Sequence, residues 1–164
     1  GQPGTGFTSP EDQEWFFSVL REFDCSIVGR KTYEASRSFI LKNLNPSRLR
    51  VVWTRHPINF QKETSPDCLE FTGEDPSGLV QVLQKKGKQN CAVLGGGSLY
   101  RAFLSEGLMD AFWVTVEPVL FGEGVPLLDS AFRCRMDLES SEKLGRNTLL
   151  LKYRPQRAVD TPED

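Results

Sequence analysis

Three consecutive glycines, Gly95, Gly96 and Gly97, follow a short apolar run at residues 91–94 and precede a segment of helical character. Glycine has no Cβ, so the backbone N–H groups of such a turn can approach a bound group closely. The N-terminus of the helix that follows favours negative charge. This order of strand, glycine turn and helix indicates a cradle for a phosphate or a dinucleotide. The alternative is a tight strand-to-helix turn that binds no ligand.

Two further apolar runs, at residues 25–28 and 49–54, end in groups that suit a phosphate. The groups that close or follow these runs are Gly29, Arg30, Lys31, Thr32, Thr54 and Arg55. Parallel strands present their carboxyl ends at one edge of a sheet, so these groups are expected to lie near Gly95, Gly96, Gly97 and Ser98. Any one of the basic residues could be a solvated surface charge. The convergence of three strand ends favours a phosphate site, in which Arg55 could pair with a cofactor 2′-phosphate.

The elements that must position these groups alternate between strands and helices. Ser9 and Pro10 form a helix start, and the apolar residues that follow at helical spacing predict one core-facing side: Trp15, Phe16, Val19, Leu20 and Phe23. Further helices are predicted from residue 75 to Gly87 and over residues 98–106, and further strands over residues 111–117 and 148–153. Unbroken apolar strands between helices predict an α/β fold, with a mostly parallel central sheet and helices on both faces.

Composition limits the class of protein. The length of 164 residues suits one domain. The net charge of −2 argues against a general nucleic-acid binder. It contains no apolar run of about 20 residues and no visible signal peptide, so a cytoplasmic protein without membrane contact is expected. The four cysteines are scattered and His56 is the single histidine, so no metal site is predicted. Cys25 and Cys91 lie in apolar runs and are expected to be small buried hydrophobes.

Several enzyme classes do not fit the sequence. There is no glycine-rich loop followed by Lys-Ser/Thr, which excludes a P-loop, and no G-x-S-x-G elbow for a serine hydrolase. Tyr100 stands where the dinucleotide-binding fingerprint would have its third glycine. Glu117, 22 residues after Gly95, resembles the ribose-binding acid of that fold. A Rossmann oxidoreductase therefore stays open as an alternative.

Two segments resemble the dihydrofolate reductase-like superfamily. Residues 27–34 (IVGRKTYE) are similar to its strand followed by G-R-x-T, and residues 93–100 (VLGGGSLY) to its second cofactor segment. Residues 107–124 resemble the C-terminal reductase domain of the riboflavin-biosynthesis deaminase–reductase, and residues 8–10 fit that family too. The order and spacing of these segments extend the resemblance over nearly the whole chain, giving one domain over residues 1–153 and a polar tail over residues 154–164.

This resemblance implies an NADPH-dependent reductase, similar to 5-amino-6-(5-phosphoribosylamino)uracil reductase, that transfers hydride to a pyrimidine or pteridine. It implies that Gly29, Arg30, Lys31 and Thr32 hold the pyrophosphate and the adenosine phosphate, and that Thr54 and Arg55 lie at the adenosine side. By the same resemblance, the segment formed by Gly95, Gly96, Gly97, Ser98, Leu99 and Tyr100 cradles the pyrophosphate and flanks the nicotinamide. A homodimer is also implied.

Two departures from the family pattern keep alternatives open. Family domains usually begin with a strand that ends in a Ser/Thr-Leu-Asp-Gly type motif, and this chain starts after that point, so the first strand is expected to be missing. Leu94 stands where the riboflavin reductases typically carry Glu. The catalytic general acid therefore remains unknown. A dihydrofolate or other pteridine reductase and a catalytically silent nucleotide-binding module are the alternatives.

Overall fold

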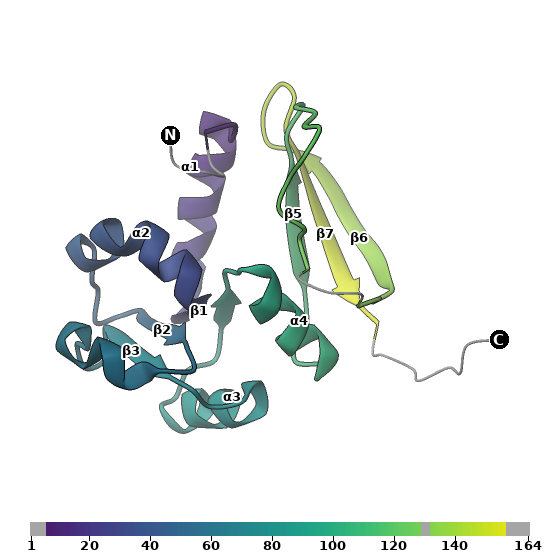
Figure 1. Ribbon diagram of the computed structural model, residues 1–164. Helices are drawn as coiled ribbons and strands as arrows, with labels where there is room; N and C mark the ends of the chain where they lie inside the picture. Colours follow the sequence, from purple (N-terminus) through teal and green to yellow (C-terminus); the bar gives the residue numbers. More distant parts are fainter. Residues whose placement is uncertain (1–5, 129–131, 157–164) are drawn as a thin grey trace.

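A computed structural model describes residues 6–128 and 132–156. Its helices are α1 (Pro10–Val19), α2 (Arg30–Lys42), α3 (Pro76–Lys85) and α4 (Gly97–Ser105), with 3-10 helices η1 (Leu20–Glu22) and η2 (Pro57–Glu63). Its strands are β1 (Cys25–Gly29), β2 (Leu49–Trp53), β3 (Leu69–Thr72), β4 (Cys91–Val93), β5 (Phe112–Val116), β6 (Met136–Lys143) and β7 (Leu149–Pro155). Figure 1 shows two groups of strands, one on each side of α4.

The first group is a parallel sheet with the strand order β3-β2-β1-β4. Cys25 of β1 lies opposite Leu49 of β2 on one side and Cys91 of β4 on the other. The strands at residues 25–28 and 91–94, which were predicted to share a sheet, are therefore direct neighbours. The predicted parallel arrangement is confirmed.

Helices cover both faces of this sheet. On one face, Ile27 and Val51 pack in a buried cluster with residues of α3 and α4 such as Leu83 and Phe103. On the other face, Val28 and Val52 pack with residues of α2 and η2, including Tyr33, Ile40 and Phe60. Successive residues of a strand point to opposite faces, so unbroken apolar strands supply both clusters at once.

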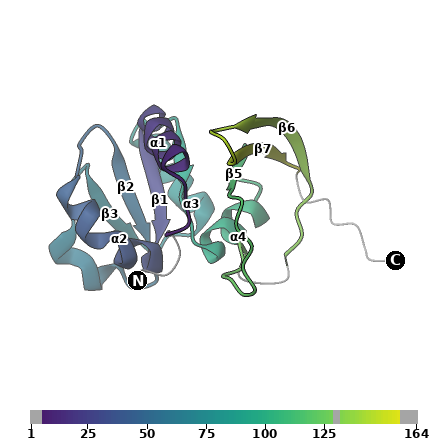
Figure 2. The same cartoon turned by 90° about the horizontal axis from the view of Figure 1, so that it is seen from above.

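The second group is an antiparallel sheet with the order β5-β7-β6, which lies beside the parallel sheet in both views (Figures 1 and 2). β7 ends at Pro155, two residues past the expected end of the domain, and the N–H of Gln156 donates to the carbonyl of Arg135. The rest of the expected tail, residues 157–164, lies outside the described residues. Among the described helices, none is long and apolar enough to cross a membrane.

Two predictions about burial are wrong. The apolar side of α1 does not enter the core: Phe16 is 37% exposed, and the buried residue of this helix is Asp12. Trp15 instead packs against Trp113 of β5, with ring centroids 6.1 Å apart. Cys25 is buried as expected, but Cys91 is exposed. The reason is that β4 is an edge strand, which sequence pattern alone does not reveal.

Candidate functional site: the glycine edge

The carboxyl ends of three parallel strands meet at one edge of the sheet, which we call the glycine edge. Gly29 ends β1 and lies opposite Trp53, the last residue of β2. On its other side, the N–H of Gly29 donates to the carbonyl oxygen of Gly95 at 2.7 Å. The structure thus brings together the three strand ends that the sequence singled out, in the spatial order β2, β1, β4.

Close backbone approach explains the glycines at this edge. A Cβ placed on Gly29 would lie 3.4 Å from both the Gly95 oxygen and the Gly96 nitrogen. Gly95 itself has φ +98°, a conformation that side-chain-bearing residues rarely adopt, and its Cβ would lie 3.0 Å from the Tyr100 hydroxyl. The hydroxyl oxygen of Thr32 would lie 3.8 Å from a Cβ placed on Gly96. The segments at residues 29–32 and 95–100 therefore form one continuous backbone surface.

Two helices begin at the glycine edge, and both begin without a side-chain cap. α2 and α4 have Gly29 and Gly96 as N-caps, and no side chain in the described chain bonds to their first N–H groups. The other two α-helices are capped: the hydroxyl of Ser9 accepts from Asp12 N–H at 3.1 Å, and a carboxylate oxygen of Asp75 accepts from Gly78 N–H at 2.7 Å. Uncapped helix N-termini present N–H groups and partial positive charge, which suits an anion.

The basic residues of the edge differ in their present partners. Arg30 already bonds to Glu34, one helical turn along α2, at 2.7 Å. Arg55 is exposed and makes no ion pair within residues 6–128 and 132–156. Lys31 and Ser98 are also exposed at the starts of their helices. Arg55 is therefore the guanidinium at this edge whose charge is not already neutralised by a neighbour.

Thr54 and Tyr100 are held in place by their surroundings. Thr54 is buried; its N–H donates to the Thr72 carbonyl at 2.9 Å, and its hydroxyl accepts from His56 N–H at 3.3 Å. Burial raises the pKa of the Tyr100 hydroxyl above its ordinary value, so this group stays protonated at neutral pH. Its ring packs edge-on against Phe112, with centroids 5.6 Å apart. Leu99 is fully buried and anchors α4 in the core.

Gly73 extends the glycine edge to the end of a fourth strand, β3, and was missed by sequence reasoning. It follows β3, and a Cβ at this position would lie 3.2 Å from the carbonyl oxygen of Thr54. The indole N–H of Trp53 donates to the next carbonyl, that of Glu74, at 2.7 Å. A glycine directly after an apolar run was the available signal. It was overlooked because the run itself, residues 69–72, was not recognised as a strand.

Glu117 does not act as the ribose-binding acid of a Rossmann fold. Its carboxylate accepts from the N–H of Ser9 at 2.7 Å and from the hydroxyl of Thr148 at 2.7 Å. These bonds join the start of α1 to the end of β5 and the start of β7. Both oxygens of the Glu117 carboxylate are thus used in hydrogen bonds within the fold. Because this acid does not face the glycine turn as a ribose-binding residue would, the Rossmann alternative is not supported.

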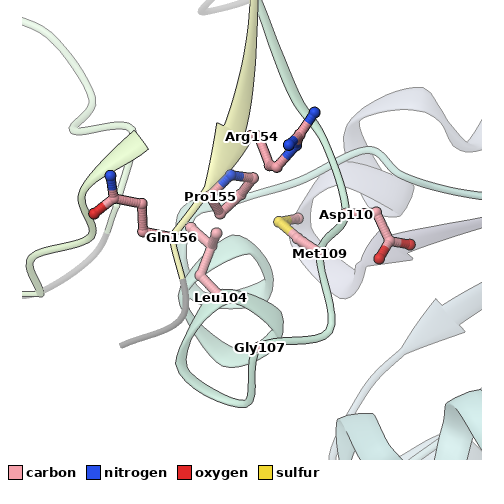
Figure 3. A pocket seen from close by; sticks show the side chains of 7 residues that line it. All are labelled: Leu104, Gly107, Met109, Asp110, Arg154, Pro155 and Gln156. Carbon is pink, nitrogen blue, oxygen red and sulfur yellow. The ribbon is translucent and has the colours of Figure 1, made fainter. Parts of the chain in front are cut away.

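Two cavities lie away from the glycine turn. One, of about 370 Å³, is lined by the end of α4, the loop behind it and the end of β7; Figure 3 shows the lining side chains, among them Leu104, Asp110 and Arg154. Because α4 begins at the glycine turn, this cavity lies at the other end of that helix. The second, of about 550 Å³, lies between α3, α4 and β4. Neither cavity is lined by Gly95, Gly96 or Gly97.

This parallel sheet, with helices on both faces and two glycine-bounded helix starts at one edge, defines a dihydrofolate reductase-like α/β fold. The chain belongs to the RibD C-terminal domain family, whose model matches residues 1–150.

Among curated proteins, the uncharacterized protein YwjB of Bacillus subtilis is 28% identical over 139 residues, which are 83% of this chain and 76% of YwjB. Among solved structures, a putative riboflavin biosynthesis protein from Shewanella sp. PV-4 has a TM-score of 0.68 at 22% identity, covering 94% of this chain and 84% of that one. Acinetobacter baumannii RibD has a TM-score of 0.72 at 17% identity; 95% of this chain is covered, but only 53% of RibD. These likenesses confirm the fold.

Proposed function

We propose that this chain is an NADPH-dependent reductase that transfers hydride to a pyrimidine-type substrate, as in 5-amino-6-(5-phosphoribosylamino)uracil reductase. The observation that carries the proposal is the pair of side-chain-uncapped helix N-termini, α2 and α4, joined by the 2.7 Å bond between Gly29 and Gly95. Membership of the RibD C-terminal domain family and a structural neighbour whose name includes that uracil reductase support the assignment.

The residues of the glycine edge fit a phosphorylated dinucleotide. In this proposal Gly29, Arg30, Lys31 and Thr32 hold the pyrophosphate and the adenosine phosphate at the start of α2. Thr54 and Arg55 lie at the adenosine side, and the uncompensated charge of Arg55 suits the 2′-phosphate. The segment formed by Gly95, Gly96, Gly97, Ser98, Leu99 and Tyr100 holds the second phosphate and flanks the nicotinamide. When bound, the reduced nicotinamide supplies the hydride.

In this proposal the residues of the chain bind the cofactor phosphates and orient the nicotinamide. The backbone N–H groups at the starts of α2 and α4 fix the phosphates, and the packed core beneath Leu99 keeps α4 from shifting. The buried Tyr100 hydroxyl keeps its proton at neutral pH and lies over Gly95. The proposal assigns no general acid, because none of these contacts places a proton donor against a substrate.

A catalytically silent nucleotide-binding module is the second candidate. The observation that favours it is the position of the two described cavities, neither of which is lined by the glycine turn. A dihydrofolate or other pteridine reductase is the alternative substrate assignment. The homodimer and the cytoplasmic location expected from the sequence stay predictions, the first of which light scattering in solution can check.

Cofactor titration and turnover separate these candidates. Intrinsic fluorescence titrated with NADPH and with NADH reports binding, and absorbance at the reduced-nicotinamide band reports consumption with the ribosylaminouracil phosphate or with dihydrofolate. We expect NADPH to bind more tightly than NADH and to be consumed with the uracil substrate. Binding without turnover of either substrate would favour the silent module, and absence of NADPH binding would overturn the proposal.

A further inference from the structure

Two arginines lie where β2 begins, at the edge of the parallel sheet opposite to the glycine edge, which we call the amino edge. Arg50 is the second residue of β2, and Arg48 precedes the strand. Arg50 shares a face of the sheet with Val52, two residues along the strand, and that face is covered by α2 and η2. Both arginines are half-buried, whereas Arg30 and Arg37, which form ion pairs, are exposed.

Neither of the two guanidinium groups at the amino edge has a counter-charge. Within residues 6–128 and 132–156, Arg48 and Arg50 make no ion pair, and their side chains donate no hydrogen bond. Burial, and then the positive charge of Arg48, lower the pKa of Arg50 below its ordinary value, so the two groups are close enough to repel each other. An arginine keeps its charge at neutral pH, so deprotonation does not relieve the repulsion. A bound anion would relieve it.

A hydroxyl group lies beside Arg50. Ser26 of β1 is the register partner of Arg50, and residues paired in this way carry their side chains on the same face. Ser26 is half-buried, and its hydroxyl makes no hydrogen bond in the described part of the chain. On the other side of Arg50, its partner on β3 is Leu69, which is fully buried in the core. Arg50 therefore lies between an unbonded hydroxyl and the edge of the apolar cluster.

The donors of this group suit a phosphate. A guanidinium presents its N–H groups in a planar fork that matches phosphate oxygens, and a serine hydroxyl supplies one further donor. A phosphate ester keeps three free oxygens and close to two negative charges, so it can meet two guanidinium groups and a hydroxyl at once. A carboxylate has two oxygens and one charge, and would leave one of the two arginines uncompensated.

We propose that Arg48, Arg50 and Ser26 form a second anion site, at the amino edge, that binds the phosphate group of a small molecule. The shared chemistry is the phosphate group, whether it belongs to inorganic phosphate or to a phosphate ester. The site is separate from the glycine edge, because Arg50 and Trp53 lie toward opposite ends of β2. It does not depend on the proposed reductase activity, since none of its three residues belongs to the glycine edge.

Nuclear magnetic resonance on the whole chain tests the proposal. The probes are inorganic phosphate and ribose 5-phosphate at millimolar concentrations, with sodium chloride of equal ionic strength as the control. We expect phosphate to give saturable shifts of the Arg48 and Arg50 side-chain N–H signals and of the Ser26 amide, and chloride to give none. Ribose 5-phosphate that shifts the same signals at the same or lower concentration identifies an ester as the ligand. Shifts with inorganic phosphate alone identify the free anion.

Variants that remove one charge complete the test. Arg50→Gln is expected to weaken phosphate binding, followed at the Ser26 amide, by at least about tenfold. Arg146→Gln removes the same charge from the exposed turn between β6 and β7, and is expected to leave that binding unchanged. Arg50→Gln should fold, since it removes a half-buried charge without a partner, and a melting temperature in phosphate-free buffer checks this. Arg48→Gln, outside the strand, is expected to weaken binding several-fold and serves if Arg50→Gln unfolds.

Three results would overturn the proposal. The first is a set of shifts that do not saturate or that chloride reproduces, because the arginines would then be ordinary solvated charges. The second is a response confined to glycine-edge amides such as that of Gly29. The third is phosphate binding by folded Arg50→Gln or Arg48→Gln that equals binding by Arg146→Gln.

Discussion

The N–H of Ser9 donates to the carboxylate of Glu117 at 2.7 Å, across 108 residues of sequence. The hydroxyls of Ser9 and Thr148 lie 3.0 Å apart, and Thr148 donates to the other oxygen of the same carboxylate. Three elements, α1, β5 and β7, are thus held by one carboxylate. Ser9 also caps α1, so the same residue starts the helix and fixes it to the antiparallel sheet.

This arrangement predicts a specific loss of stability in acid. The N–H of Ser9, and then the hydroxyl of Thr148, lower the pKa of Glu117 below its ordinary value of 4.5. A carboxyl whose folded pKa is depressed stabilises the fold above the unfolded pKa, and this contribution disappears as pH falls through the folded value. We expect Glu117→Gln to melt below wild type at pH 7, with the difference shrinking below about pH 4.5. Thermal melts from pH 3 to 8 check this, and an unchanged difference would contradict it.

Thr148 is 3% exposed, and its hydroxyl bonds to Glu117 and lies 3.0 Å from that of Ser9. We expect Thr148→Val to cost about 1–3 kcal/mol, because the Glu117 and Ser9 groups lose a buried partner. Urea unfolding measures the free energy directly. Ser140→Ala, at a half-exposed hydroxyl of β6 whose bond to Glu142 is 3.5 Å long, serves as the control and is expected to change stability by less than about 0.5 kcal/mol.

The two neighbouring glycines of the turn should respond differently to the same change. Gly95→Ala forces a side chain into φ +98° and against the Tyr100 hydroxyl, which we expect to destabilise the fold by about 1–3 kcal/mol. At Gly96, φ is −83° and the nearest atom to an added Cβ is 3.8 Å away, so Gly96→Ala is expected to melt close to wild type. Equal destabilisation by both changes would contradict the backbone geometry described for Gly95.

Arg55 should determine the choice of cofactor. If its guanidinium meets the 2′-phosphate, Arg55→Ala removes a charge-assisted contact and weakens NADPH binding by about tenfold or more, with NADH unaffected. Arg21→Ala is the matched control, because Arg21 is exposed and precedes β1 at the opposite edge of the sheet. Fluorescence titration of the three proteins with both cofactors gives the result. Equal binding of both cofactors to wild type, with no change in Arg55→Ala, would show that the assignment is wrong.

The environment of Tyr33 predicts that this residue ionises only in strong alkali, with a loss of stability. It is fully buried, and its hydroxyl donates to Glu63, which also pairs with Arg37 at 2.7 Å. Burial, and then the bond to Glu63, raise its pKa to about 12. A group with a raised pKa stabilises the fold below its unfolded value of 10.0, and this contribution is lost as pH rises toward 12.

We expect ultraviolet titration of tyrosinate to show a step near pH 12 that Tyr33→Phe removes. The same variant should lose about 1–3 kcal/mol at pH 7, since Glu63 loses a hydrogen-bond donor. Tyr153→Phe is the comparison, because Tyr153 lies in the antiparallel sheet and is only partly buried. A step near pH 12 that survives in Tyr33→Phe would contradict the assignment.

Three of the four strands of the parallel sheet could be predicted because their signals are local and agree with one another. Apolar runs followed by glycine or basic residues identified β1, β2 and β4, and Ser9 and Pro10 identified the start of α1. Asp75 and Gly87 likewise bounded α3, with Gly87 at φ +76°. The convergence of three strand ends then followed from the geometry of parallel sheets alone.

The features that could not be predicted depend on tertiary neighbours, which the local sequence pattern does not reveal. β6 carries charges on both faces because it is an outer edge strand, so it shows no apolar alternation. β3 has four residues and was too short to stand out. Arg30 was assigned to phosphate binding without regard to Glu34, although the spacing of four residues on a helix was there to predict their pairing.

The contact between Ser9 and Thr148 joins residues that leave the ribosome at very different times, since 139 positions separate them. Synthesis delivers all of the residues at the glycine edge, from Gly29 to Tyr100, before any strand of the antiparallel sheet exists. On a nascent chain, α1 can therefore form with the Ser9 hydroxyl as its cap before Glu117 is available to accept from the Ser9 N–H. Its docking must wait until Thr148 has emerged, near the end of translation.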